Sequence, residues 1–457
     1  MERRTLAETK NRRTLAEAPR TQRTQSIYSI SNLKPKISSI ILENLYFKNK
    51  NLNLNSSLRP LRPRVSAREI LKFPVLFLVI SFFLISCDFS FGEKKVEDPT
   101  WETITPLKDI YKSHFPIGNI VANRNEITTM RFDILKRHFN AATAENDMKP
   151  DYIAPQNKPA PGAVWNYRFS NADAIVNAAR AAGMEMHGHT LVWHSQTPSW
   201  LTRDINNNND LDRDEVLANL QKYVTDVTTH FKGRLTTWDV ANEVFRDSLQ
   251  DVTASTDWKT CLRVDAPSGQ SNTSFSPWNR IIGPEFIEIA FLAARDADPG
   301  VKLYYNDYNL NNPNKAQAVF NMVKDINTRH SNVGGRKLID GIGMQSHHHI
   351  YTSPQSVEAS IILFSQLGVE IAITELDIQA AGTFGDRPQI IWGENAARLQ
   401  ADQYAAMFRI FKKYSNIITR VTFWGLDDGT SWRSNTHPTL LDKDYNLKPA
   451  FFAVVNP

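Results

Sequence analysis

The sequence predicts an α/β protein, a (β/α)8 TIM barrel that forms a single domain. Eight segments with strand character are separated by helical or long connections within about 350 residues. Several helical patterns also stop at a glycine directly before the next predicted strand, so one helix–strand unit recurs along the chain. A doubly wound open sheet is the alternative, but it requires a glycine-rich phosphate-binding turn after an early strand, and the sequence has none.

The predicted elements follow one another in a regular order. Strands are expected at residues 115–121, 139–146, 184–193, 235–243, 301–309, 341–347, 369–377 and 418–428. A helix over residues 170–182 begins at a capping box of Ser170 and Asp173 and stops at Gly183. Three further helices open at Pro284 and over residues 356–367 and 395–414, and each precedes a predicted strand.

Composition and charge are those of an ordinary globular protein with an unusual beginning. The 457 residues are 41% apolar and 22% charged, and the net charge is +5. Residues 1–70 contain 15 Lys and Arg against 5 Asp and Glu, whereas the remaining residues carry 38 against 43. Because the predicted barrel is slightly acidic, nucleic acid is excluded as its main partner.

The segment before the barrel has the features of an export signal. An uninterrupted apolar run at residues 75–85 follows Arg68 and Lys72 and is too short to span a bilayer as an anchor helix. Residues 84–87 (LISC) resemble the bacterial lipobox, in which the cysteine becomes lipidated. We therefore expect a lipoprotein-type signal peptide at residues 71–87, a lipid on Cys87, and an exported bacterial protein that is membrane-anchored or secreted. A buried helix or strand is the alternative for the apolar run.

The predicted signal peptide also determines what we expect of the residues before and after it. Residues 1–70 are polar and repetitive, so we expect a disordered leader or a segment upstream of the true translation start, near Leu71. Residues 88–100 form a short tether, and residues 101–457 form the barrel. If Cys87 carries the lipid, Cys261 is left without a disulfide partner.

Chemistry-bearing residues gather where the predicted strands end, which is where active sites of such barrels lie. They are Glu145, Asn146, Lys149, His187, His189, Trp193, His194, Asn242, Glu243, residues 306–309, Gln345, His347, Glu375, Asp377, Trp424, Asp427 and Trp432. Glu243 and Glu375 each follow apolar strand residues. Two carboxyl groups facing one cleft are what glycosidic bond cleavage requires.

The aromatic residues and histidines allow more than one interpretation. The rings of Trp193, Trp424 and Trp432 follow strand ends, where flat rings stack on sugars, whereas Trp238 is expected in the core. Core packing and stacking on sugars remain equally open for Trp101, Trp165 and Trp278. A barrel metallohydrolase site built from His187, His189, His347, His349 and Asp427 is an alternative. The Asn-rich segment 204–215 lacks the central glycine of a calcium loop, which favours a polar turn before a helix from Asp214.

Seven co-linear segments resemble endo-1,4-β-xylanases of glycoside hydrolase family 10. They are residues 144–149 (AENDMK), 188–200 (GHTLVWHSQTPSW), 238–243 (WDVANE), 305–309 (YNDYN), 341–347 (GIGMQSH), 373–377 (ITELD) and 423–428 (FWGLDD). The match extends from about Pro116 to Phe452. The resemblance implies a retaining double-displacement mechanism on xylan and xylo-oligosaccharides. We expect a monomer without a cofactor or metal, and the lipobox-like segment limits its expected membrane contact to a lipid on Cys87.

The resemblance also assigns roles to individual residues. Glu375 corresponds to the nucleophile, Glu243 to the acid/base, His347 to the hydrogen-bond partner of the nucleophile, and Asn242 to the residue that binds the sugar 2-hydroxyl. Substrate binding falls to Glu145, Asn146, Lys149, His189 and Trp193 on the glycone side, to Gln345, Trp424 and Trp432 at the −1 subsite, and to Tyr308 and Asn309 on the aglycone side.

Three departures from the family pattern bear on specificity. Ala241 replaces a valine and Pro150 replaces an aromatic residue, the latter next to the distal glycone cleft. Residues 250–276 match the family poorly and follow the strand that carries Glu243. Two other functions remain open: a glycosidase for β-1,4-glucan or aryl cellobiosides, and a sugar-binding protein without catalysis, against which the presence of both glutamates argues.

Overall fold

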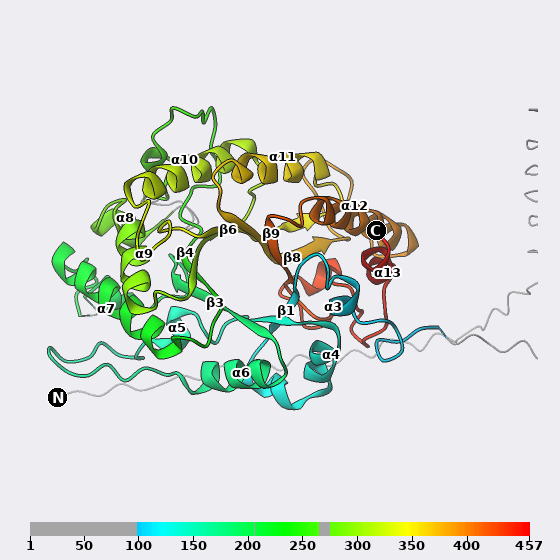
Figure 1. Ribbon diagram of the computed structural model, residues 1–457, viewed down its shortest axis with the longest axis horizontal. Coiled ribbons are helices and arrows are strands. Elements are labelled where there is room, and N and C mark those ends of the chain that lie inside the picture. Colours follow the sequence, from blue (N-terminus) through cyan, green and yellow to red (C-terminus); the bar gives the residue numbers. More distant parts are fainter. Residues whose placement is uncertain (1–97, 205, 265–274) are drawn as a thin grey trace, which may run out of the picture. The chain divides into compact units, whose positions relative to one another are not determined.

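The computed structural model describes residues 98–204, 206–264 and 275–457 (Figure 1). The predicted leader 1–70, the predicted signal 71–87 with Cys87, and residues 88–97 of the predicted tether lie outside the described residues. Among the described helices, none is long and apolar enough to cross a membrane.

Eight parallel strands close into a barrel, as the sequence predicts. Their order is β6-β5-β4-β3-β2-β1-β9-β8, and pairing of β6 with β8 closes the ring. The strands are β1 (Ile117–Val121), β2 (Ala141–Ala144), β3 (Glu185–Val192), β4 (Thr237–Asn242), β5 (Lys302–Asp307), β6 (Gly341–Met344), β8 (Glu370–Gln379) and β9 (Ile418–Phe423). A short strand that the sequence did not predict, β7 (His347–His349), pairs with the carboxyl end of β8.

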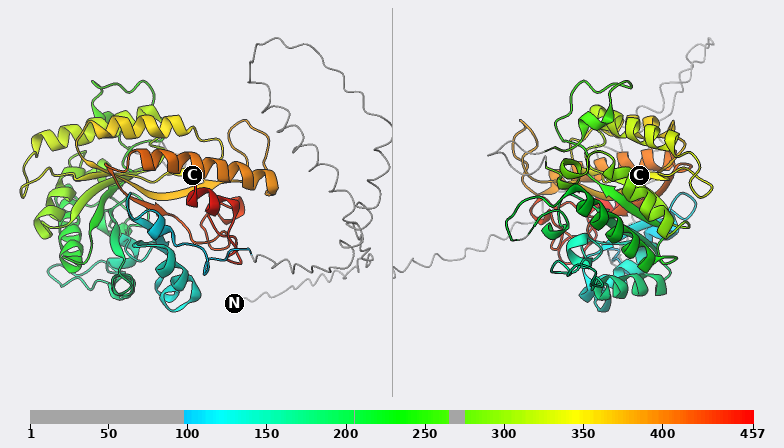
Figure 2. Two further views of the ribbon diagram at one scale, coloured as in Figure 1. Left: turned by 45° about the vertical axis from the view of Figure 1, so that its right-hand side comes forward. Right: turned by 90° about the vertical axis from the view of Figure 1, so that its left-hand side faces the viewer.

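Helices form the outer layer of the barrel, which Figures 1 and 2 show from three directions. They are α3 (Leu107–Ile110), α4 (Met130–His138), α5 (Pro150–Ile153), α6 (Ser170–Ala181), α7 (Arg213–Phe231), α8 (Pro277–Ile281), α9 (Phe286–Ala297), α10 (Pro313–Arg329), α11 (Pro354–Ser365), α12 (Glu394–Lys413) and α13 (Pro449–Val455). Single 3-10 turns are η2 (Arg124–Thr128), η3 (Ser199–Leu201), η4 (Trp258–Cys261) and η6 (Ser434–Thr436). The apolar face of each long helix packs on the strands, and this leaves the strand ends to build a site.

The predicted capping box at the start of α6 is wrong. Phe169 is the N-cap residue, and Ser170 already lies inside the helix. Asp173 Oδ1 instead lies 2.9 Å from His230 Nε2 and 2.7 Å from Arg234 Nη1. The carboxylate that the local pattern assigned to the helix cap is therefore bound by residues distant in the sequence. The helix does stop at Gly183, whose φ of +76° favours glycine.

Other helix boundaries shift by one or two residues. The predicted helix at 284 begins at Phe286, and the helix predicted from residue 356 begins at Pro354. In the second case Ser353 accepts a hydrogen bond from the Ser356 amide, so the cap lies earlier than the apolar pattern indicated. The polar turn predicted at 204–215 leads into α7 through Asp212, and Asp204 Oδ1 accepts the Asn206 amide at 2.9 Å.

Tight packing between the strands and the surrounding helices fixes the positions of the strands. Trp238 is buried as predicted, and its indole lies against Gly188 of β3, where a side-chain Cβ would come within 2.3 Å of the ring. Trp278 is also buried, whereas Trp101 and Trp165 pack on the core only in part. Because β3 and β4 are held this closely, the residues that follow them are placed with little freedom.

Candidate active site

The carboxyl ends of the strands enclose a cleft of about 580 Å³. Thirteen of the fourteen predicted site residues line it: Glu145, Asn146, Lys149, His189, Trp193, Asn242, Glu243, Tyr308, Gln345, His347, Glu375, Trp424 and Trp432. Asn309 does not line this cleft. The cleft is also lined by His194, which the sequence placed at a strand end without assigning it a role, and by four residues that the prediction did not name: Ser195, Gln196, Arg263 and Arg433. The structure thus brings the predicted residues together, while their individual roles stay predictions.

Glu243 follows the last residue of β4 and has a left-handed backbone, with φ of +56°. Its carboxylate accepts hydrogen bonds from Trp193 Nε1 and Gln345 Nε2, both at 2.9 Å. Burial raises the pKa of Glu243, and the nearby charges of Asp307 and Glu375 add to that effect, while the two hydrogen bonds oppose it. A carboxyl group in this setting tends to hold a proton, which suits a general acid.

Glu375 lies within β8 and is buried. Burial favours its neutral form, but this effect is outweighed by hydrogen bonds from His347 (3.2 Å) and Asn306 (2.8 Å) and by the charges of the nearby histidines. The pKa of Glu375 is therefore lowered, in contrast to that of Glu243. Two carboxyl groups with opposite tendencies in one cleft are the arrangement of a nucleophile and an acid.

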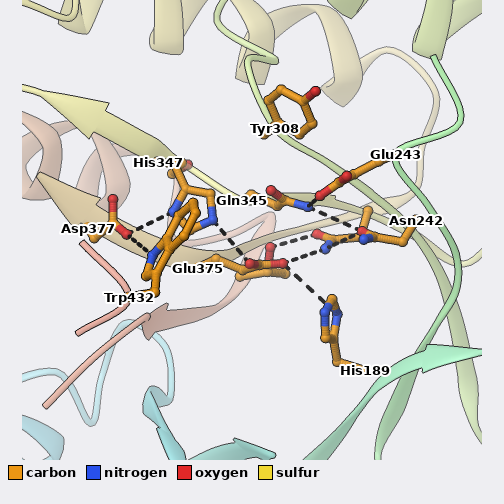
Figure 3. A network of polar contacts seen from close by, with 12 residues as sticks. His189, Asn242, Glu243, Tyr308, Gln345, His347, Glu375, Asp377 and Trp432 are labelled. Carbon is orange, nitrogen blue, oxygen red and sulfur yellow. Dashed lines mark hydrogen bonds and ion pairs between the residues drawn. The ribbon is translucent and has the colours of Figure 1, made fainter. Parts of the chain in front are cut away.

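Glu375, His347 and Asp377 form a chain of alternating negative and positive charges (Figure 3). His347 lies between Glu375 and Asp377, with Nδ1 2.9 Å from Asp377 Oδ2. Burial opposes the charge of His347, but Asp377 and Glu375 together raise its pKa to about 9. Asp377 also accepts hydrogen bonds from Trp432 Nε1 (2.9 Å) and Arg433 (3.2 Å). Asp377 therefore holds both the Trp432 ring on the wall of the cleft and, through His347, the carboxylate of Glu375.

Asn242 lies between the two glutamates and keeps a donor available. Its Oδ1 accepts from Asn306 Nδ2 at 3.0 Å and from Gln345 Nε2 at 3.2 Å. Its Nδ2 is buried and finds no acceptor among the described residues. A buried amide donor without a protein partner is costly unless a ligand satisfies it. This geometry fits a hydrogen bond from Asn242 to a substrate hydroxyl.

One end of the cleft is polar and rigid. Lys149 Nζ donates to Asn146 Oδ1 (3.0 Å) and to Gln196 Oε1 (2.9 Å), and it lies 5.2 Å from the centre of the Trp193 ring. Burial lowers the pKa of Lys149, and burial raises that of Glu145. Gln196 belongs to the quoted segment 188–200, so its sequence signal was present although the residue was not selected.

The histidines and Asp427 of the metal alternative are engaged elsewhere. His187 and His189 both contact Asp239, His349 stacks on Phe384, and Asp427 pairs with Arg131. Across residues 98–204, 206–264 and 275–457, no group of three His, Cys, Asp or Glu side chains is arranged to hold a metal ion. The residues proposed as ligands therefore do not converge on one point.

Comparison with known proteins places these observations in a family. The model of Glycosyl hydrolase family 10 matches residues 106–457. The chain is 39% identical to endo-1,4-beta-xylanase A of Thermotoga neapolitana over 81% of this chain and 32% of that protein. It is 36% identical to beta-1,4-xylanase of Dictyoglomus thermophilum over 83% of this chain and 98% of that protein.

Solved structures give the same result. The intracellular xylanase TsXylA of Thermoanaerobacterium saccharolyticum is 36% identical, with a TM-score of 0.64 over 77% of this chain and 98% of that one. The chain spans about a third of the length of the Thermotoga relative but nearly all of the Dictyoglomus one. The shared part is therefore the barrel that carries the cleft.

Proposed function

This chain belongs to glycosyl hydrolase family 10, and we propose that it is a retaining endo-1,4-β-xylanase that cleaves internal β-1,4-xylosidic bonds of xylan and xylo-oligosaccharides. The observation that carries the proposal is the opposite pKa tendency of Glu243 and Glu375 within one cleft. A retaining glycosidase needs one protonated and one ionised carboxyl group in the same resting state.

In the first step, the Glu375 carboxylate attacks the anomeric carbon of the −1 sugar and forms a covalent glycosyl-enzyme intermediate. Glu243 gives its proton to the glycosidic oxygen as the bond to the leaving sugar breaks. His347, held by Asp377, keeps Glu375 ionised before the attack. The free Nδ2 of Asn242 donates to the 2-hydroxyl of the same sugar, a contact that strengthens in the transition state.

In the second step, Glu243 has lost its proton and acts as a base. It takes a proton from a water molecule, whose oxygen attacks the anomeric carbon and displaces Glu375 as the leaving carboxylate. The sugar keeps its original configuration because it has been inverted twice. The enzyme returns to its starting protonation state without a cofactor in either step.

Preference for xylose is proposed from the family resemblance and from the aromatic wall of the cleft. Trp424 is buried against His189, and Trp432 is fixed through Asp377. In the family, these walls crowd the position where the hydroxymethyl group of glucose would project. We therefore expect xylan to be cleaved in preference to β-1,4-glucan.

The test is reducing-end release by the purified protein from xylan and from a soluble β-1,4-glucan. Preferential release of short oligomers from xylan supports the proposal, and activity on neither polymer contradicts it. Glu375→Ala should lose nearly all activity, whereas Glu243→Ala should retain activity on substrates with good leaving groups. Normal turnover of xylan by both variants would show that the roles are assigned wrongly.

We also propose export as a monomeric lipoprotein, on the basis of the apolar run 75–85 and Cys87. In the native host, the lipidated protein should fractionate with membranes and carry a mass increment on Cys87. Cys87→Ala should move the activity to the soluble fraction. Soluble protein without a lipid in the unaltered strain would contradict the lipoprotein assignment, and a mass in solution above that of one chain would contradict the monomer.

A further inference from the structure

The connection that follows β4 returns to the cleft within residues 244–263. Phe245 and Leu262 form an antiparallel bridge. The Arg263 amide donates to the Val244 carbonyl at 2.8 Å, and the Arg246 amide donates to the Cys261 carbonyl at 3.1 Å. These bonds fold the connection back on itself. Arg263, some twenty residues beyond Glu243 in the chain, is thereby brought beside it.

Arg263 is a buried cation that joins two walls of the cleft. Its side chain is 1% exposed. Nε donates to the backbone oxygen of Glu243 at 2.7 Å, and Nη2 donates to the hydroxyl of Tyr308 at 2.7 Å. Because a guanidinium group is planar and its donors are fixed relative to one another, this single group sets the position of both acceptors.

The backbone that Arg263 holds is an unfavourable one. A left-handed φ of +56° is uncommon for a residue with a side chain, and it persists only where the surroundings fix it. Glu243 is fixed on both sides: its amide donates to the Asn306 carbonyl at 2.9 Å, and its carbonyl accepts from Arg263. Without the second bond, the peptide after Glu243 can rotate. The alignment of the Glu243 carboxyl group with the glycosidic oxygen then depends, among the described residues, on Trp193 and Gln345 alone.

Tyr308 is held from a second direction as well. Lys315 Nζ lies 3.9 Å from the centre of its ring and pairs with the buried Asp307 at 2.8 Å. The hydroxyl of Tyr308 is the acceptor for Arg263. The ring therefore keeps one orientation on the cleft wall, on the side where the resemblance places the leaving sugar.

We propose that Arg263 is a positioning residue that holds the acid/base Glu243 and the aglycone wall at Tyr308 in a fixed relation, so that the proton reaches the leaving oxygen. This inference rests on the proposed function. The carboxylate of Glu375 is held by hydrogen bonds from Asn306 and His347. Loss of Arg263 should therefore impair proton donation and spare nucleophilic attack.

The experiment uses the full chain and two aryl β-xylobiosides that differ only in the leaving group. Dinitrophenol leaves without protonation, whereas phenol requires it, so the pair separates attack from proton transfer. Arg263→Met should reduce kcat/KM by at least about tenfold on the phenyl substrate and by less than about threefold on the dinitrophenyl one, since general acid catalysis contributes about 10²–10⁴-fold. Arg263→Lys should show the same selective loss, because one ammonium group lacks the fixed fork of donors.

Arg295→Met is the matched control for removing a buried arginine. Arg295 is 2% exposed, pairs with Asp340 and donates to the Val301 and Leu338 carbonyls at the opposite end of the strands. Its variant should change both substrates by the same factor, in proportion to the folded fraction measured by thermal melting. This control separates a loss of folded protein from a loss of proton transfer.

Each outcome decides the inference. A selective loss on the phenyl substrate supports it. An equal loss on both substrates in folded Arg263→Met protein, or no loss on either, overturns it. If the unaltered protein cleaves neither xylobioside, the proposed function itself fails and the inference falls with it.

Discussion

Trp193→Phe tests the electrostatic basis of the acid/base assignment. The substitution keeps an aromatic ring beside Lys149 and removes the indole N–H that donates to Glu243 Oε2 at 2.9 Å. That hydrogen bond stabilises the carboxylate, so its loss disfavours the charged form and raises the pKa of Glu243 further. Since the proposed mechanism requires protonated Glu243 in its first step, the alkaline limb of the kcat/KM profile should move to higher pH.

The size of the movement follows from the strength of one hydrogen bond. A hydrogen bond to a charged group contributes about 1.5–3 kcal/mol. Glu243 keeps its second donor, Gln345 Nε2 at 2.9 Å, and water in the cleft replaces part of the lost interaction. The lower end of that range is therefore expected. Because about 1.4 kcal/mol corresponds to one pH unit, the alkaline limb should move upward by about one unit.

The assay is kcat/KM for phenyl β-xylobioside, whose leaving group requires protonation, between about pH 4 and 10, since this quantity reports the free enzyme. Weaker binding in Trp193→Phe lowers the whole profile but does not move its limbs. Trp165→Phe is the matched control, because Trp165 packs edge-on to Trp200 and does not line the cleft. An alkaline limb that stays in place or moves to lower pH would refute the assignment of that limb to Glu243.

Two further predictions concern stability. The pKa of His347 is about 9 in the folded protein and near 6.5 when unfolded, so its charge stabilises the fold fully below about pH 6.5 and the contribution is lost as pH rises through 9. The melting temperature of His347→Asn should therefore fall furthest below that of the unaltered protein near pH 6, and a difference that grows towards pH 10 would contradict this. Gly188→Ala places a Cβ 2.3 Å from the Trp238 ring and should destabilise the barrel by about 1–3 kcal/mol in denaturant unfolding. Gly393→Ala is the control, because the Cβ added there meets no other atom within 4 Å. Equal effects of the two changes would refute the packing argument.

Most of the barrel could be predicted from the sequence because its signals are local. Each strand is an apolar run of a few residues that ends in polar ones, and Gly183 marks a helix end through its own backbone preference. The capping box failed because Asp173 binds His230 in α7 and Arg234 just beyond the end of that helix. The strand β7 was missed because its residues, 347–349, are all histidines. Signals of this kind depend on tertiary contacts that a linear pattern does not contain.

The site residues likewise divide into those that local sequence signals predict and those that depend on the tertiary fold. Thirteen of fourteen predicted residues line the cleft because the ends of parallel strands meet at one face of a barrel. Asn309 lies two residues beyond the end of β5, and the chain has already turned there. Arg263 and Arg433 were missed because they come from long connections, and neither has a spacing that relates it to Glu243 or Glu375.

The most direct test of the central claim is to trap the covalent intermediate with a dinitrophenyl 2-deoxy-2-fluoro-β-xylobioside. The fluorine slows both steps, but the good leaving group lets the first step proceed, so the glycosyl-enzyme accumulates. A double-displacement mechanism with Glu375 as nucleophile predicts a mass increase of one fluoroxylobiosyl group, on the peptide that contains Glu375. An active enzyme that gains no sugar, or that gains it on Glu243, would contradict the mechanism.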